Sequence, residues 1–138
     1  ANGAANDNFG ISVALSGDTA LVGAFADDVG ANANQGSAYV FTRSGTTWTQ
    51  QAQLTAIAGA AGDNFGISVA LSGDTALVGA SGDDVGANAD QGSAYVFTRS
   101  GTIWTQQTKL TASGGAAIDQ FGNSVALSGD SAIIGAPN

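Results

Sequence analysis

An eighteen-residue segment that occurs twice without change is the feature that most constrains the fold of this chain. The segment DNFGISVALSGDTALVGA occupies 7–24 and again 63–80, and a looser copy begins at Asp119. The copies therefore start 56 residues apart, and the first two 56-residue units differ at only nine positions. A period of this length without a helical hydrophobic pattern indicates stacked β units. We expect one repeat array over 1–138, made of unit 1 (7–62), unit 2 (63–118) and a partial unit 3 (119–138).

Each full unit predicts four short antiparallel strands. In unit 2, 67–71 alternates large and small residues, whereas 75–80 is almost continuously apolar and fits a strand covered on both faces. Short Ser-Gly-Asp and Ser-Gly-Thr segments predict the hairpin turns. The fourth strand is rich in Thr and Gln, as expected of a sheet edge that faces water. The predicted strands are 10–15, 19–24, 37–43, 47–54, 66–71, 75–80, 93–99, 103–110, 122–127 and 131–135.

Two short motifs recur in register in all three units. Phe-Gly stands at 9–10, 65–66 and 121–122, and Gly-Ala stands at 23–24, 79–80 and 135–136, followed by Pro only at Pro137. With this pair of motifs the chain resembles the FG-GAP repeats of integrin α-subunit propellers and of many bacterial surface proteins. The resemblance covers 7–138 and implies an all-β fold of β-propeller blades. Each blade would have four antiparallel strands, and about two and a half blades would be present.

The chain departs from the integrin repeats at the place where those repeats bind Ca²⁺. The resemblance places a longer Asp-rich loop between the first and second strands of a blade. Here the corresponding turn is only Ser-Gly-Asp, at 16–18, 72–74 and 128–130. So short a turn cannot enclose a cation that takes roughly six to eight oxygen ligands. The integrin calcium site is therefore not carried over to this chain.

The composition excludes several classes of site and partner. The chain contains no Cys and no His, which excludes disulfides, thiolate metal sites and the most common general base. Eleven Asp against three basic residues give a net charge of −8, which disfavours nucleic acid and anionic membranes as partners. No apolar run is long enough for a membrane span, so membrane insertion is not expected. An acidic, Cys-free chain rich in Gly, Asn and Thr predicts a secreted or cell-surface protein.

The long loops between the second and third strands carry the candidate cation ligands. Because strand direction alternates, these loops and the loops between units leave the same face, and eight of the eleven Asp fall in this set. Carboxylate and amide oxygens are suitable ligands for Ca²⁺. The candidates for weak Ca²⁺ binding are Asp83, Asp84, Asn88 and Asp90, with their counterparts Asp27, Asp28, Asn32 and Asn34. The alternative is that these residues only satisfy a long, soluble turn.

Other conspicuous side chains have structural interpretations. Asp7, Asp63 and Asp119, each two residues before the Phe of the motif, are expected to bond backbone amides of the following turn. Trp48 and Trp104 are expected to pack in the core or between blades rather than to stack on sugars. No nucleophile–base pair is visible, since His and Cys are absent and the single lysine lies on a polar edge strand. The chain is therefore not expected to be an enzyme.

Two functions remain open at this point. The first is a non-catalytic adhesion, binding or scaffold module whose acidic loops engage a surface protein or a glycan, with or without Ca²⁺. The second is structural self-assembly, because nearly identical units can offer the same packing faces to copies of the same chain. Closed propellers use roughly four to eight blades, which is more than this chain holds. Further blades from a longer parent protein, several chains closing one ring, or chains joined end to end as a filament could each complete the array. We expect a homo-oligomer or polymer, with a closed ring favoured slightly over a filament.

Overall fold

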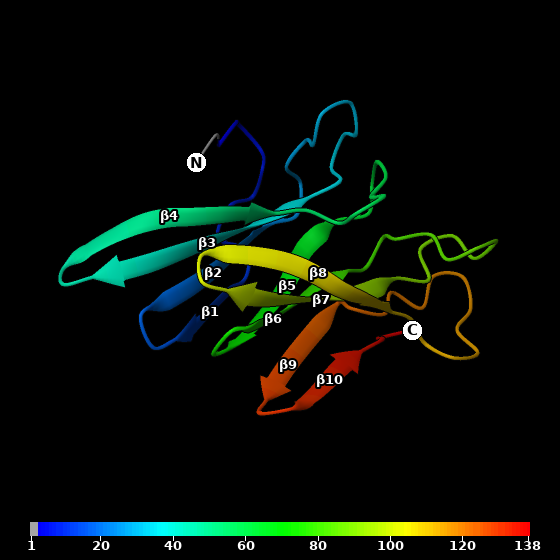
Figure 1. Ribbon diagram of the computed structural model, residues 1–138. Coiled ribbons are helices and arrows are strands. Elements are labelled where there is room, and N and C mark those ends of the chain that lie inside the picture. The colour runs from blue at the N-terminus through cyan, green and yellow to red at the C-terminus, as the bar shows by residue number, and fades with distance from the viewer. Residues whose placement is uncertain (1–2) are drawn as a thin grey trace.

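Short antiparallel strands joined by turns and long loops make up the protein. The computed structural model describes 3–138, in which the strands form two four-stranded sheets and one two-stranded sheet (Figure 1). The strands are β1 Val13–Ser16, β2 Thr19–Ala24, β3 Ser37–Ser44, β4 Thr47–Leu54, β5 Phe65–Ser72, β6 Thr75–Ala80, β7 Ser93–Ser100, β8 Ile103–Leu110, β9 Ser124–Ser128 and β10 Ser131–Gly135. Within 3–138 no helix has the length and apolar character needed to cross a membrane.

Each sheet is a meander in which every strand pairs with the next one along the chain. The orders are β1-β2-β3-β4 in unit 1 and β5-β6-β7-β8 in unit 2, and β9 pairs with β10 in unit 3. The registers repeat, since Val22 lies opposite Tyr39 in unit 1 and Val78 lies opposite Tyr95 in unit 2. Neighbouring sheets pack through their first strands, β1 and β2 against β5, and β5 and β6 against β9. The predicted all-β class with four-stranded propeller-like units is confirmed.

All ten predicted strands are present, and two of them begin later than expected. β1 begins at Val13, three residues late, and β9 begins at Ser124, two residues late. Before β1, Gly10 has a φ of 94° and the backbone N–H of Ile11 donates to the carbonyl oxygen of Asn8 (3.1 Å). The chain therefore turns tightly where the sequence pattern alone predicts extended backbone, and the same turn precedes β9.

The Phe-Gly half of the motif fixes the start of each unit. The ring of Phe65 is fully buried, with its centroid 5.5 Å from that of Tyr95 and 5.9 Å from that of Phe97, both edge to face. Gly66 has a φ of 94°, which glycine adopts without steric strain, and the pairing of β5 with β6 shifts register at this point. The motif thus joins an aromatic anchor to the backbone kink that leads into the first strand.

The Gly-Ala half of the motif makes the joint between units. A Cβ on Gly23 would overlap the carbonyl oxygen of Gly66 in the next unit, and a Cβ on Gly79 would overlap that of Gly122. The hydroxyl of Ser12 donates to the same Gly66 carbonyl oxygen (2.9 Å). Glycine is required here because two backbones come into direct contact. The two halves of the motif, taken from successive units, therefore meet at each joint.

The hydrophobic core lies between the sheets rather than within one of them. Leu21 and Val40 of unit 1 form one buried cluster with Phe65 of unit 2. A second cluster around Leu77 joins unit 2 to unit 3. Within unit 2, β6 is buried on both faces while β8 is largely exposed, as the sequence pattern predicts for an inner strand and an edge strand.

Candidate functional site

The long connecting segments lie together at one end of the sheets. We name this surface the loop face and define it by 3–12, 25–36, 55–64, 81–92 and 111–123. Figure 1 shows these loops at the top and right, with the hairpin turns at the left and bottom. Backbone hydrogen bonds join neighbouring loops, including those from Gly62 N–H to Ala33 O and from Phe65 N–H to Gln35 O, both 2.9 Å. The loop face is therefore one connected surface.

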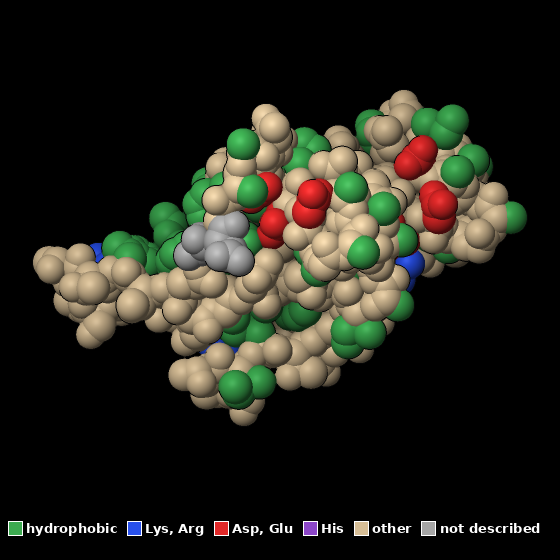
Figure 2. Space-filling model, turned by 90° about the horizontal axis from the view of Figure 1, so that it is seen from above, with side chains coloured by type: hydrophobic (Ala, Val, Ile, Leu, Met, Phe, Trp, Pro, Cys, Tyr) green, Lys and Arg blue, Asp and Glu red, His purple; other side chains and the backbone are tan. Residues whose placement is uncertain are grey.

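The loop face carries most of the charge of the protein. It holds eight of the eleven Asp, and Lys109 at the adjoining end of β8 leaves a formal charge of −7 there, against −1 for the hairpin end. At the hairpin end Asp18 pairs with Arg43 (2.6 Å) and Asp74 pairs with Arg99 (2.7 Å). In Figure 2 the acidic side chains visible from above gather over the half of the molecule that carries the long loops. Such a concentrated negative field attracts cationic partners.

Asp27 is buried at the base of the first long loop, where its carboxylate accepts hydrogen bonds from the sheet. Its Oδ2 accepts from the hydroxyl of Tyr39 (2.8 Å), from Nε2 of Gln53 (3.2 Å) and from the hydroxyl of Ser37. A carboxylate removed from water must find such donors, because an unsatisfied buried charge is very unfavourable. These bonds hold the loop against β3 and β4.

Unit 2 has a basic side chain at the corresponding place. Oδ2 of Asp83 accepts from the hydroxyls of Tyr95 (2.7 Å) and Ser93, and Nζ of Lys109 lies 2.7 Å from the same oxygen. Lys109 stands opposite the tyrosine in β7, as Gln53 stands opposite the tyrosine in β3. Unit 2 therefore neutralises its buried carboxylate with an ammonium group, whereas unit 1 supplies only an amide.

Asp28 and Asp84 close their own loops. Oδ1 of Asp28 accepts from the backbone N–H of Asn34 (2.8 Å), and Oδ1 of Asp84 accepts from that of Asp90 (2.9 Å). Asn34 and Asp90 both have a φ of 52°, a left-handed conformation that Asn and Asp adopt more readily than most residues. All four residues therefore have a local role in the turn.

Asn32 and Asn88 connect each long loop to the loop that follows. Nδ2 of Asn32 donates to Oε1 of Gln35 (2.8 Å) and to the carbonyl oxygen of Gly59 (3.0 Å). Asn88 makes the same two bonds in unit 2, at 2.8 and 3.1 Å. The amide side chains thus stiffen the loop face.

The eight predicted cation ligands lie on one face but do not form one cluster. Within 3–138 no three His, Cys, Asp or Glu side chains come close enough together to hold a metal ion. Asp27 and Asp83 face hydroxyl groups of the sheet, and Asp28 and Asp84 face backbone amides of their own loops. This arrangement is not a cage of roughly six or more oxygens around Ca²⁺. Ca²⁺ binding stays a prediction from the sequence.

The aspartates that precede each Phe-Gly motif accept backbone hydrogen bonds, as predicted. The donors, however, lie in the turn before the motif and not in the turn after it. Their Oδ2 atoms accept from the N–H groups three residues earlier, which belong to Ala4 (2.5 Å), Ala60 (2.7 Å) and Ala116 (2.7 Å). The prediction of a bond to the following turn is therefore wrong for Asp7, Asp63 and Asp119. The turn that needs an acceptor is the one before the motif, because the following turn closes through backbone bonds alone.

Burial shifts the pKa of three groups near the loop face. It raises the pKa of the Asp63 carboxyl, an effect that the hydrogen bond from Ala60 N–H opposes. It also raises the pKa of the Tyr39 and Tyr95 hydroxyls, and the adjacent Asp27 and Asp83 carboxylates raise those pKa values further. Both tyrosines therefore stay neutral and continue to donate to the buried aspartates.

The two tryptophans have different surroundings. Nε1 of Trp104 donates to Oε1 of Gln51 in unit 1 (2.9 Å), and the ring lies 5.2 Å from the guanidinium carbon of Arg99. Trp48 is 44% exposed, and the centroid of its ring lies 5.7 Å from the guanidinium carbon of Arg43. The predicted packing between blades is confirmed for Trp104 and is wrong for Trp48, whose side of unit 1 is not covered by another unit within 3–138.

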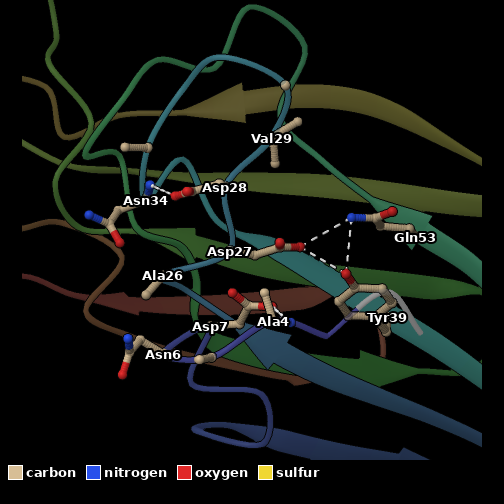
Figure 3. Close-up of a pocket in the computed structure, with 13 residues that line it drawn as sticks. Ala4, Asn6, Asp7, Ala26, Asp27, Asp28, Val29, Asn34, Tyr39 and Gln53 are labelled. Atoms are coloured by element: carbon tan, nitrogen blue, oxygen red, sulfur yellow. Dashed lines mark hydrogen bonds between the residues drawn. The ribbon is translucent and has the colours of Figure 1, made fainter.

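A polar pocket of about 560 Å³ opens on the loop face of unit 1 (Figure 3). Three carboxylates line it, and Figure 3 shows Asp27 between Asp7 on one side and Asp28 on the other. The hydroxyl of Tyr39 and the amide of Gln53 complete its inner wall. No basic side chain is among the described residues that line it. The pocket is therefore lined by carboxylates that no basic side chain of its described lining offsets.

Sequence reasoning missed the pairing of Lys109 with Asp83. It treated Lys109 only as part of a polar edge strand. The signal was present, because Gln53 to Lys109 is one of the nine differences between the units. Placing that residue opposite the tyrosine through the hairpin register would have brought it to the loop face.

Comparison with known proteins agrees with this architecture. The family model described as FG-GAP repeat matches three segments of the chain, 1–41, 48–97 and 104–138. None of the curated proteins matches the chain. The three matched segments correspond in number to the two full units and the partial unit of the structure.

Proposed function

Because this chain belongs to the FG-GAP repeat family, we propose that it is a non-catalytic extracellular module for binding or adhesion. The family is generally one of non-enzymatic binding modules with a propeller-like repeat fold, and its repeats are typically extracellular. The proposed binding surface is the loop face. The proposed partner is a protein surface that presents Lys or Arg side chains.

One observation carries the choice of a cationic partner. In unit 2 the ammonium group of Lys109 lies 2.7 Å from Asp83, beside Tyr95. In unit 1 the corresponding buried carboxylate is that of Asp27, and Gln53 stands at the position of the lysine. A cationic side chain of a partner would therefore meet in unit 1 the arrangement that Lys109 occupies in unit 2. Charge-assisted bonds of this kind are stronger than neutral ones.

The charge of the whole loop face supports the same partner. A formal charge of −7 on one end of a small protein steers cationic groups toward it, and added salt weakens such steering. The pocket beside Asp27 is the place where we propose that the cationic group binds.

Calorimetric titration with the peptide acetyl-Lys-Lys-amide at low ionic strength tests this proposal. Gln53→Lys places an internal ammonium group beside Asp27, so it is expected to weaken binding at least about tenfold, which corresponds to about 1.4 kcal/mol. Lys109→Gln is the matched control in unit 2 and is expected to leave binding equal or stronger. Equal affinity of the parent protein and Gln53→Lys for the peptide would remove the pocket from consideration. Binding of a neutral glycan that is unaffected by Gln53→Lys would replace the cationic partner with a carbohydrate.

A further inference from the structure

The outer side of unit 1 carries the same apolar residues as the side of unit 2 that packs on unit 1. We name this outer side face A and define it by Phe9, Ile11, Val13, Leu15 and Trp48. Phe9 is 48% exposed and Leu15 is 71% exposed. Their counterparts in unit 2 belong to the packed core, where Phe65 is fully buried and Leu71 is partly buried. Face A is therefore an uncovered copy of an interface that this molecule already forms.

The outer side of β9 and β10 carries the complementary half of that interface. We name it face B and define it by Ser124, Ala126, Ile133 and Gly135, which together with Val125 line a shallow hollow of about 170 Å³. The side chain of Val125 itself packs inward, against the cluster around Leu77. Ile133 is 74% exposed, whereas its counterparts Leu21 and Leu77 are fully buried at the joints to the next unit. Face B is therefore an uncovered copy of the surface that unit 1 offers to unit 2.

Polar groups at the two faces match in the same way. The hydroxyl of Ser12 donates to Gly66 O (2.9 Å) at the first joint, and that of Ser68 donates to Gly122 O (2.7 Å) at the second. The third serine of this series is Ser124 on face B, and the first carbonyl of the series is that of Gly10, beside face A. A Cβ on Gly135 would meet no backbone atom of another unit, unlike one on either earlier glycine of the motif.

The two strands of unit 3 correspond to the strands that make most of the strand-to-strand contacts at the first joint. β5 packs mainly on β1 and β2, and only slightly on β3. β9 and β10 correspond to β1 and β2 by the 56-residue period. Face B therefore offers the half of the contact surface that β1 and β2 provide in unit 1. The contributions of β3 and β4 at the first joint, such as those of Val40 and Gln51, have no counterpart in unit 3 within 3–138.

We propose that face A of one copy of this chain docks on face B of a second copy, head to tail, and so repeats the part of the joint between units 1 and 2 in which β1 and β2 pack on β5. The contact would bury the Leu15 and Ile133 side chains and would place Ser124 Oγ of one copy against Gly10 O of the next. Because the two faces are different, an open assembly of any length keeps a free face A at one end and a free face B at the other, so it grows as a filament or closes into a ring. This inference concerns the ends of the array and does not rest on the proposed function, although Phe9 and Ile11 of face A also belong to the loop-face segment 3–12.

Sedimentation of the 138-residue chain across micromolar concentrations in 0.15 M NaCl tests the proposal, with circular dichroism to confirm folding. The parent chain is expected to form species larger than the 13.4 kDa monomer. Leu15→Asp on face A and Ile133→Asp on face B are each expected to remain monomeric. Ile57→Asp is the matched control, since Ile57 is 70% exposed but lies in a loop outside both faces, and it is expected to assemble like the parent.

Mixing the two face variants gives the decisive measurement. Leu15→Asp retains an intact face B and Ile133→Asp retains an intact face A, so an equimolar mixture is expected to form a dimer that grows no further. Assembly of Ile133→Asp alone would show instead that face A pairs with face A, and assembly of Leu15→Asp alone would show that face B pairs with face B. Either result would overturn the head-to-tail contact. A parent chain that stays monomeric at every concentration would overturn it as well.

Discussion

Trp104 donates a hydrogen bond from Nε1 to Oε1 of Gln51 across the joint between units 1 and 2, at 2.9 Å. The counterpart of Gln51 in unit 2 is Gln107, which is exposed and donates only to the carbonyl oxygen of Thr105 in its own strand (3.4 Å). The two glutamines therefore differ in their hydrogen bonds, because within 3–138 only Gln51 faces a tryptophan of the following unit.

Gln51→Ala is therefore expected to lower the free energy of unfolding by about 1 kcal/mol, because the indole N–H loses its acceptor. Gln107→Ala is expected to change it by less than about 0.5 kcal/mol, as is usual for exposed positions. Urea denaturation at one fixed protein concentration measures both. Equal losses for the two variants would show that the Trp104 bond contributes nothing.

Phe65 and Phe9 form a second matched pair. Both rings pack edge to face on a tyrosine of their own unit at 5.5 Å, but only Phe65 is covered by a neighbouring unit. Phe65→Ala is expected to destabilise the protein by about 3–5 kcal/mol, the range for deleting a buried aromatic ring. In a monomer, Phe9→Ala is expected to lower the free energy of unfolding by less than half as much as Phe65→Ala does. Thermal or urea unfolding checks the ratio, and similar costs would contradict it.

Lys109 and Gln53 allow a charge exchange between the units. Lys109→Gln is expected to lower the free energy of unfolding by about 1 kcal/mol, because the exposed ammonium group that pairs with the buried Asp83 is lost while an amide donor remains. Gln53→Lys is expected to recover part of this loss by pairing with Asp27. Repeating the denaturation in 1 M salt should reduce both effects, since the lysine is partly exposed to solvent. Salt-independent effects would point to packing rather than charge.

Asp63 predicts a specific pH dependence. Burial raises the pKa of this carboxyl above its unfolded value, so between the two pKa values the folded state binds more protons than the unfolded state. The contribution of Asp63 to stability therefore falls as the pH rises through that acid window. Asp63→Asn removes this contribution and keeps an oxygen for the Ala60 N–H. The stability of the parent relative to Asp63→Asn is expected to decline as the pH rises from about 3 towards neutrality. A stability difference between the two proteins that stays constant or rises with pH would contradict the raised pKa of Asp63.

Ca²⁺ binding, which the sequence predicts for 83–90 more than for 27–34, is expected to be weak. Within 3–138 the geometry holds no preformed cage, and modules that bind Ca²⁺ weakly have dissociation constants of about 10⁻⁴–10⁻³ M. Calorimetric titration is expected to show weaker binding by Asp84→Ala and Asp90→Ala than by the parent. Equal uptake by all three proteins would exclude these two side chains as ligands.

The 56-residue period and the apolar alternation predicted the existence, order and pairing of the strands. They succeed because side-chain alternation and turn residues are local properties of the sequence. The turn through Gly10, which precedes β1, was not predictable in this way, because its residues suit a strand. The same turn through Gly66 lies inside β5, where the pairing with β6 shifts register between Phe65 and Ser68. The bond direction of Asp63 and the pairing of Lys109 with Asp83 also depend on loop geometry and cross-strand register, which no single segment encodes. Trp48 was misjudged because its burial depends on a neighbouring unit rather than on its own strand.

The contact between Gly23 and the backbone of Gly66 sets the distance between units without any side chain. A surface residue can therefore change in one unit without moving the next. The first two units illustrate this freedom: six of their nine differences lie in loop-face segments, and none lies at the Phe-Gly or Gly-Ala positions. An array joined in this way can acquire different binding properties in each unit while the geometry of the whole stays constant.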